Sequence, residues 1–199
     1  MIDDLDKSLE VLLKRELPAW LVDQVAISFA TPDDQFPPTT VTLPAIDLFL
    51  YDVRENRDLR SNEWLVERHN DGSVTRQRTP TRVECSYLIT AWANTNSNTP
   101  AQEEHRMLGA VMQALLRHPT LPDAVLQGTL KGQQPALPTT SLQSGRLQSP
   151  ADFWQALGGK PKAALHCTVT ISVAAHEPIA AGPAVTDKVI RIKQGLEES

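Results

Sequence analysis

The sequence predicts an α+β fold in which a largely antiparallel central sheet is flanked by two longer helices and one short helix. Two long segments, 2–17 and 99–118, repeat apolar residues at the spacing of one helical face. Several shorter segments alternate apolar and polar residues as half-buried strands do, and Asp71-Gly72 is typical of a hairpin turn. Helices and strands in this order are typical of one mixed domain with an antiparallel sheet.

The two longer helices are predicted by their ends as well as by their periodicity. The first, over 2–17, has acidic residues in its first turn, where the helix dipole favours anions, and it ends before Pro18. The second begins at Thr99, the expected N-cap, with Gln102 in the capping-box position. The short helix is expected to begin at Ser149-Pro150 and to end at the glycine pair Gly158-Gly159.

The strands are predicted from alternation and from apolar runs. Residues 45–53 are apolar on both faces apart from Asp47 and Asp52, which is typical of a strand at the heart of a sheet. The strand that carries Cys85 is expected to pair with the strand that carries Cys167. The full set of predicted strands is 25–30, 45–53, 63–67 with 74–78 as a hairpin, 82–91, 124–130 and 165–173.

Size and composition predict one main core. A chain of 199 residues, 41% hydrophobic and 22% charged, can bury enough surface to fold without a disulfide or a metal. We expect one domain over 1–176, followed by a Pro- and Ala-rich linker and an extended tail over 177–199.

Charge and hydropathy argue against two classes of partner. The net charge of −5 disfavours wrapping of nucleic acid through a general basic surface. No run reaches the roughly 18 apolar residues of a membrane span, and the first residues lack the features of a secretory signal. We therefore expect neither a nucleic-acid nor a membrane partner, and a location in the cytosol.

The residue types that carry chemistry predict no catalytic, cofactor or metal site. His105 and His118 lie thirteen residues apart on one helix, which separates them by roughly 220° around its axis, so they cannot share a metal. Cys85 and Cys167 sit within apolar alternation that predicts buried, inert thiols. The expectation is a protein that is not an enzyme.

Arg54, Arg57 and Arg60, in the segment RENRDLR, are the main candidates for a binding surface. One interpretation is a solvated loop end, because Glu55 and Asp58 are interspersed among the arginines. The other is a docking surface for an acidic partner, since each arginine presents a planar fork of donors that suits carboxylates.

Two further features are candidates for a protein interface. Trp64 and Trp92 lie near element ends and fit either a core plug or an interface anchor, whereas Trp154 is expected in the core. The tail segment after Pro183 has strand-forming character and needs an edge to pair with, in its own sheet or in a neighbouring subunit. Its candidate residues are Val185, Val189, Ile190 and Ile192.

Five segments in one order carry a resemblance to a known family. They are MIDDLDKSLEVLLKRELP, IDLFLYDVRENRDLR, RVECSYLITAWA, EEHRMLGAVMQALLRHPTLP and ALHCTVTISV. Over about 1–175 they resemble the N-terminal domain of the cap proteins of phage-tail-like contractile injection systems, a family that includes terminators of the antifeeding-prophage type. The combination of segments, rather than any single motif, carries the resemblance.

The resemblance implies a tail-terminator-like fold and a structural role. It implies a protein that sits on the distal end of the inner tube and sheath, ends their polymerisation and fixes particle length as a homohexameric ring. Its partners would be further copies of itself and the sheath and inner-tube subunits, joined during assembly in the cytosol. The alternatives are a baseplate or tube-to-sheath adaptor of the same particle and, in another class, a small cytosolic hydrolase.

Overall fold

The computed structural model describes residues 1–143 and 150–183, and these form two compact units. The first unit joins Met1–Arg60 with Thr81–Val173, and the second joins Ser61–Pro80 with the described residues 174–183.

The first unit is built on a five-stranded sheet with the order β1-β2-β5-β7-β6. β1 runs parallel to β2, and every other neighbouring pair is antiparallel, which confirms the predicted fold class. The strands are β1 (Ala26–Ser28), β2 (Ala45–Glu55), β5 (Thr81–Trp92), β6 (Thr139–Ser141) and β7 (Ala164–Val173).

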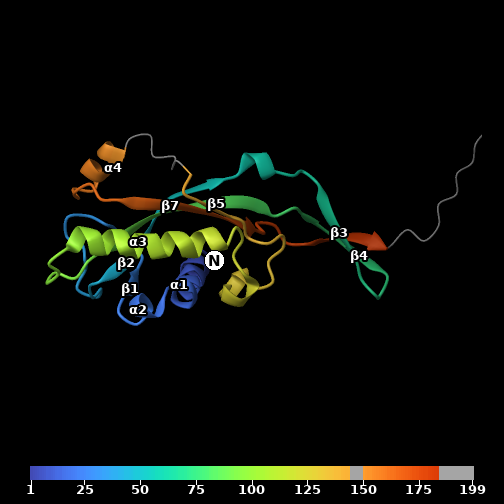
Figure 1. Ribbon diagram of the computed structural model, residues 1–199. Helices are drawn as coiled ribbons and strands as arrows, with labels where there is room; N and C mark the ends of the chain where they lie inside the picture. The colour runs from blue at the N-terminus through green and yellow to red at the C-terminus, as the bar shows by residue number, and fades with distance from the viewer. Residues whose placement is uncertain (144–149, 184–199) are drawn as a thin grey trace, which may run out of the picture. The chain divides into compact units, whose positions relative to one another are not determined.

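Helices cover both faces of this sheet (Figure 1). The predicted long helices, α1 (Ile2–Glu16) and α3 (Pro100–Arg117), lie on one face with the short α2 (Ala19–Val22), and α4 (Pro150–Ala156) lies on the other. α3 begins where the sequence predicts, but the Thr99 side chain makes no capping hydrogen bond, because its backbone is not in the usual capping conformation.

The core lies between the sheet and the two long helices. Alternate residues of β5 and β7 face it, and the pairing of Cys85 with Val169 and of Tyr87 with Cys167 confirms the expected neighbours. α1 contributes a row of leucines that are almost fully buried, each of which stabilises the fold by about 1.5–3 kcal/mol. These leucines are Leu5, Leu9, Leu12 and Leu13.

The middle strand of the sheet is β5, so the prediction that 45–53 lies at its heart is wrong. β2 is fully buried only over Ala45–Leu48 and becomes half-buried and then exposed toward Glu55. Its outer neighbour β1 pairs only with Ala45–Asp47. Apolar residues in the later part of β2 instead pack against α4, where Phe153 contacts Phe49 and Tyr51.

The strand predicted over 124–130 is also wrong, because the segment forms two 3₁₀ turns, η2 (Asp123–Val125) and η3 (Gly128–Leu130). Side chains of α1 hold these turns in place. Asp4 Oδ2 accepts hydrogen bonds from Thr129 N at 3.1 Å and Thr129 Oγ1 at 2.8 Å, and Ser8 Oγ accepts one from Gln127 N at 2.9 Å. The apolar residues that suggested a strand pack into the core between these bonds.

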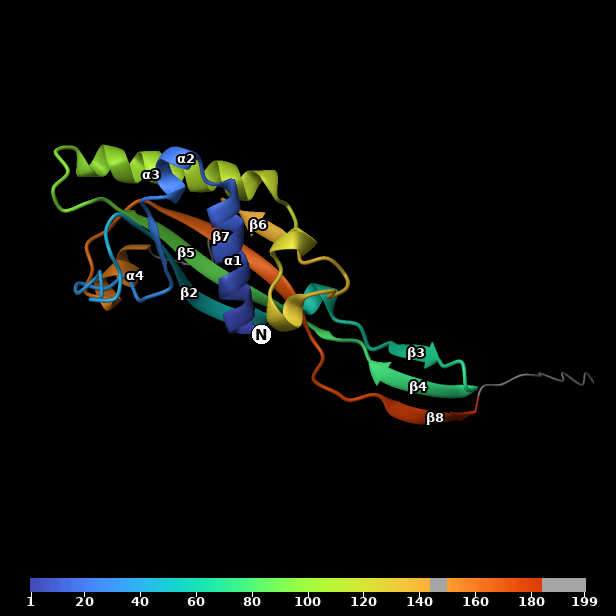
Figure 2. The same cartoon turned by 90° about the horizontal axis from the view of Figure 1, so that it is seen from below.

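The second unit is a three-stranded antiparallel sheet with the order β3-β4-β8 (Figure 2). The predicted hairpin is confirmed as β3 (Trp64–Arg68) and β4 (Ser73–Arg78), and Gly72 has the positive φ of 84° that its turn requires. β8 (Ile179–Pro183) lies in the segment expected to be a linker. Residues 61–80, expected within the 1–176 domain, thus share a sheet with residues from the expected linker.

Within 1–143 and 150–183, no helix combines the length and the apolar character that a membrane crossing requires.

Candidate assembly surfaces

The described residues form no group of three or more histidine, cysteine, aspartate or glutamate side chains that could hold a metal ion. Both cysteines are buried, and burial raises the pKa of each thiol, Cys85 and Cys167, to about 11. A thiol of that pKa stays protonated at neutral pH and is a poor nucleophile. The cysteines therefore act as small apolar core residues, as predicted.

Asp47 is the one fully buried carboxylate among the described residues. Its Oδ1 accepts a hydrogen bond from Ala30 N at 3.0 Å, whereas its Oδ2 is buried without a hydrogen-bond partner in the described structure. Burial raises the pKa of Asp47 to about 6, and it outweighs the opposing interactions with the Ser28 side chain and the Ala30 main chain.

Asp47 and Asp52 lie on the same face of the sheet, although residues five apart in a regular strand would face opposite sides. The register of β2 shifts between Leu50 and Asp52, so that Asp47 lies opposite Thr90 and Asp52 lies opposite Ser86. Thr90 and Ser86 are four residues apart on β5 and share a face. The bulge turns Asp52 toward the face where it pairs with an arginine.

The predicted arginine segment, 54–60, forms a fixed loop at the end of β2, which we call the η1 loop after its 3₁₀ turn, η1 (Arg57–Leu59). Asn56 holds its shape. The Asn56 Oδ1 atom accepts from Asp58 N at 3.1 Å and Leu59 N at 3.2 Å, and its Nδ2 donates to Glu84 Oε1 at 2.8 Å. The Asn56 main-chain N–H also donates to Arg82 O at 2.8 Å, which ties the loop to β5.

Two of the three arginines are neutralised within the loop region itself. Arg54 pairs with Asp52, and Arg60 forms a two-point pair with Glu55 that lowers the pKa of that carboxyl. Within the described ranges Arg57 has no ion-pair partner. The structure therefore reduces the predicted three-arginine surface to one arginine, Arg57, with an unpaired charge.

The surroundings of Arg57 are polar and open. The η1 loop and β5 line a surface hollow of about 530 Å³, whose walls include Asp52, Asp58 and Glu84. Within the η1 loop, the apolar side chain of Leu59 is 48% exposed. Interleaved charges with exposed aliphatic side chains suit a protein contact.

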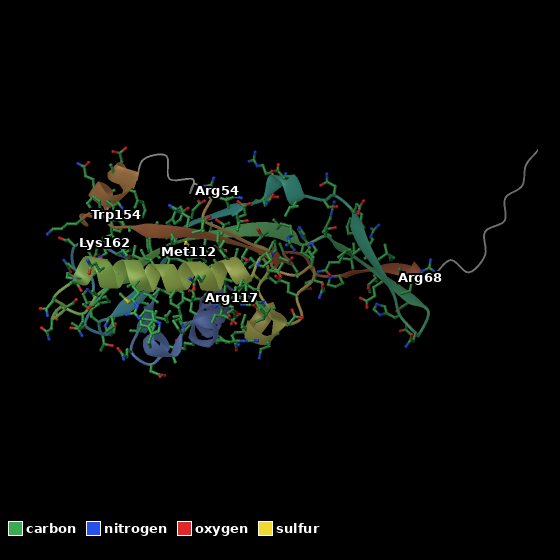
Figure 3. The ribbon with its side chains drawn as sticks, viewed as in Figure 1. Arg54, Arg68, Met112, Arg117, Trp154 and Lys162 are labelled. Carbon is green, nitrogen blue, oxygen red and sulfur yellow. The ribbon has the colours of Figure 1, made fainter. Side chains whose placement is uncertain are left out.

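The tryptophans divide between packing and exposure. Trp154 is buried, as predicted (Figure 3). Trp92 stacks on Phe36, with the two ring centroids 4.3 Å apart. Lys162 Nζ lies 4.2 Å from the centroid of the Trp92 ring. The contact between Trp92 and Phe36 anchors the proline-rich segment that carries Phe36. The alternation pattern of the sequence does not predict the contact. Trp64 remains 38% exposed on β3.

The tail candidates Val185, Val189, Ile190 and Ile192 lie outside the described residues.

Two of three comparisons with known proteins find matches to this chain. A family model described as the Pvc16 N-terminal domain matches residues 4–187. A comparison with curated protein sequences finds no match.

Two solved structures share the fold. One is the sheath/tube terminator of the PVC extracellular contractile injection system in its extended state, with a TM-score of 0.69, 24% identity and coverage of 100% of this chain and 65% of that one. The other is the tube-terminating cap of the anti-feeding prophage, with a TM-score of 0.63, 22% identity and coverage of 96% and 61%.

This chain therefore spans a little under two thirds of the length of each solved relative. The similarity confirms the terminator-like fold, and the match to the family model extends over most of the sequence. The chain belongs to the Pvc16 N-terminal domain family.

Proposed function

We propose that this protein is a structural terminator that closes the distal end of the inner tube and sheath of a contractile injection particle and stops their growth. The observation that carries the proposal is the family match over residues 4–187, together with a fold shared with two proteins named as a terminator and a cap. A protein in this role binds and positions its neighbours and needs no catalytic residue.

The proposal includes a homohexameric ring assembled in the cytoplasm. A closed ring lets each copy meet one chain of a six-fold tube and sheath end, and most soluble homo-oligomers have closed point-group symmetry. Within each copy, the η1 loop would contact an acidic neighbour through Arg57. The tail around Val185 and Ile190 would pair with the edge strand of a neighbouring subunit.

A density map of the intact particle tests the location and the ring. Particles purified from the producing cell are imaged, and the map is compared with that of particles from a strain lacking this protein. We expect a ring of six copies at the end distal to the baseplate, which is lost in the deletion strain. Density for this chain at the baseplate would instead support an adaptor, and a ring of another symmetry would contradict the hexamer.

Removal of 184–199 tests the role of the tail. We expect the chain of residues 1–183 to fold with an unchanged thermal midpoint and to be missing from particles. Loss of cooperative unfolding would show instead that the tail belongs to its own sheet.

A further inference from the structure

Strand β3 of the second unit presents large apolar side chains to water. All five of its residues are exposed, including Trp64, Leu65 and Val66, whose exposed fractions are 38%, 52% and 62%. An exposed apolar strand at a sheet edge is prone to pair with other chains, and natural proteins avoid it unless it has a partner.

Two hydrogen bonds establish which backbone groups of β3 point outward. Thr79 N donates to Glu63 O at 3.4 Å at one end of the hairpin, and His69 N donates to Ser73 O at 2.9 Å at the other. In an antiparallel pair, residues bonded to the opposite strand alternate with residues whose N–H and C=O point away from it.

The alternation turns the N–H and C=O groups of Trp64, Val66 and Arg68 toward the open side of the strand. β3 is an edge strand, and in 1–143 and 150–183 no backbone group bonds to these three residues from that side. The edge therefore offers donors and acceptors in the geometry that a further strand uses.

The same three residues carry a cationic and apolar face. Trp64 and Val66 lie opposite Arg78 and Arg76 of β4, and these two guanidinium groups lie 4.4 Å and 4.7 Å from the Trp64 ring centroid. Arg68 is at the turn end of β3 (Figure 3), and none of the three arginines has an ion-pair partner within the described chain. We call Trp64, Val66, Arg68, Arg76 and Arg78 the tryptophan–arginine face.

We infer that the outer edge of β3 receives an extended strand from a different protein of the particle, with acidic residues at alternate positions facing the tryptophan–arginine face. The inference rests on the proposed function. Main-chain bonds to the open edge would supply affinity, and every second side chain of the added strand would meet this face. Arginine forks next to an aromatic ring suit carboxylates, so those side chains should be acidic or aliphatic.

The tail of this chain does not have the chemistry of that strand. Between residues 185 and 193 it carries Lys188, Arg191 and Lys193 against a single acid, Asp187. Placing those cations beside three arginines would oppose binding. Charge complementarity therefore favours an acidic strand from another protein over a second copy of this tail.

A photo-crosslinking experiment identifies the occupant. Trp64 is replaced by p-benzoyl-phenylalanine in the full chain, particles are assembled and purified, and irradiated samples are analysed by mass spectrometry. We expect crosslinks to one segment of a different particle protein with acids at alternate positions. Crosslinks confined to residues 184–199 of this chain, crosslinks to nucleic acid, or none in particles that contain the chain would each overturn the inference.

Two glutamate substitutions on adjacent residues form a matched pair. Val66→Glu places a carboxylate on the tryptophan–arginine face, where it would repel the acids of the added strand, whereas Leu65→Glu adds the same charge to the opposite face. We expect Val66→Glu to reduce incorporation into particles by roughly 30-fold, as loss of a central contact does, and Leu65→Glu to incorporate almost normally. Equal incorporation of the two variants overturns the inference.

The wild-type chain separates this inference from the proposed function. If wild type is absent from particle ends, the proposed function fails. If wild type is present and Val66→Glu incorporates equally well, only the β3 inference fails. Arg76→Glu combined with Arg78→Glu provides a second variant, with the same expected loss, should Val66→Glu not fold.

Discussion

At the residue scale, two contacts set the local stability of the first unit, one buried in the sheet and one near the surface. Asp47 keeps a carboxylate inside the sheet with one hydrogen-bonded oxygen, and Gly128 lets Asp4 approach the η3 turn. Neither contact belongs to a proposed interface, so both can be tested on the isolated protein.

Asp47→Asn should remove a pH dependence of stability. The pKa of Asp47 is raised to about 6 in the folded state, above its ordinary value of 3.8, so between these values the folded state binds more protons than the unfolded state. Asp47 therefore contributes to the free energy of unfolding at low pH. This contribution, about 3 kcal/mol in total, is lost as the pH rises through about 6.

Asparagine keeps an oxygen that can accept from Ala30 N but does not titrate. We expect the stability of Asp47→Asn relative to wild type to increase from pH 4 to pH 8, as measured by urea unfolding at several pH values. Taking the difference between the two proteins cancels the titration of other groups. A difference that stays constant with pH would show that the carboxyl is not desolvated.

Gly128→Ala should destabilise the protein strongly. Gly128 has a φ of 52°, and an added Cβ would lie 2.0 Å from Asp4 Oδ1, so Asp4 would have to give up its bonds to Thr129. We expect a loss of about 2–4 kcal/mol in the free energy of unfolding.

Gly109→Ala is the matched control for that substitution. It lies in α3 with no atom within 4 Å of an added Cβ, and it should gain about 0.5–1 kcal/mol from helix propensity. Similar effects of the two alanines in urea melts would contradict the role given to the Asp4 contact.

At the element scale, the η1 loop shows why a charge count along the sequence overstates a binding surface. Arg54, Arg57 and Arg60 look equivalent in the sequence, but the bulge in β2 and the bend at Asn56 bring acids to two of them. Of the three arginines, only Arg57 can be substituted to test docking without breaking an internal ion pair.

Arg57→Glu should block assembly and leave folding unchanged. A surface substitution of this kind changes stability by less than about 0.5 kcal/mol, so the thermal midpoint should stay within a few degrees. Lys131→Glu, the same reversal at another exposed cation of the first unit, should join particles normally. If Arg57→Glu also assembles as wild type does, the loop is only solvated.

The elements that the sequence predicts well are those whose own pattern decides their structure. α1, β5, β7 and the β3–β4 hairpin have strong periodicity or a diagnostic turn, and each lies where it is expected. Elements that depend on residues far away in the sequence are predicted poorly. β8 has a weak pattern and is a strand because β4 pairs with it, and η3 is a turn because Asp4 lies against it.

The same reasoning separates what could be predicted of the candidate surfaces. Exposed arginines and Trp64 can be identified in the sequence. The outward backbone groups of β3 and the unpaired state of Arg57 depend on register and on side-chain pairing, which alternation alone cannot supply.

At the scale of the whole molecule, the chain combines a closed core with surfaces suited to neighbouring subunits. The first unit has a continuous core of its own, whereas the second is a small sheet whose β3 strand is exposed throughout. A small three-stranded sheet with exposed apolar residues gains stability when another chain covers it. This division suits a subunit that folds before it joins a particle.

The length distribution of particles tests termination most directly. Particles are measured by electron microscopy from the wild-type strain, from a strain lacking this protein and from that strain supplied with the wild-type chain. We predict a narrow distribution in the wild type, uncapped particles of widely variable length in the deletion strain, and restoration of the narrow distribution on add-back. Particles of unchanged, uniform length in the deletion strain would contradict this prediction.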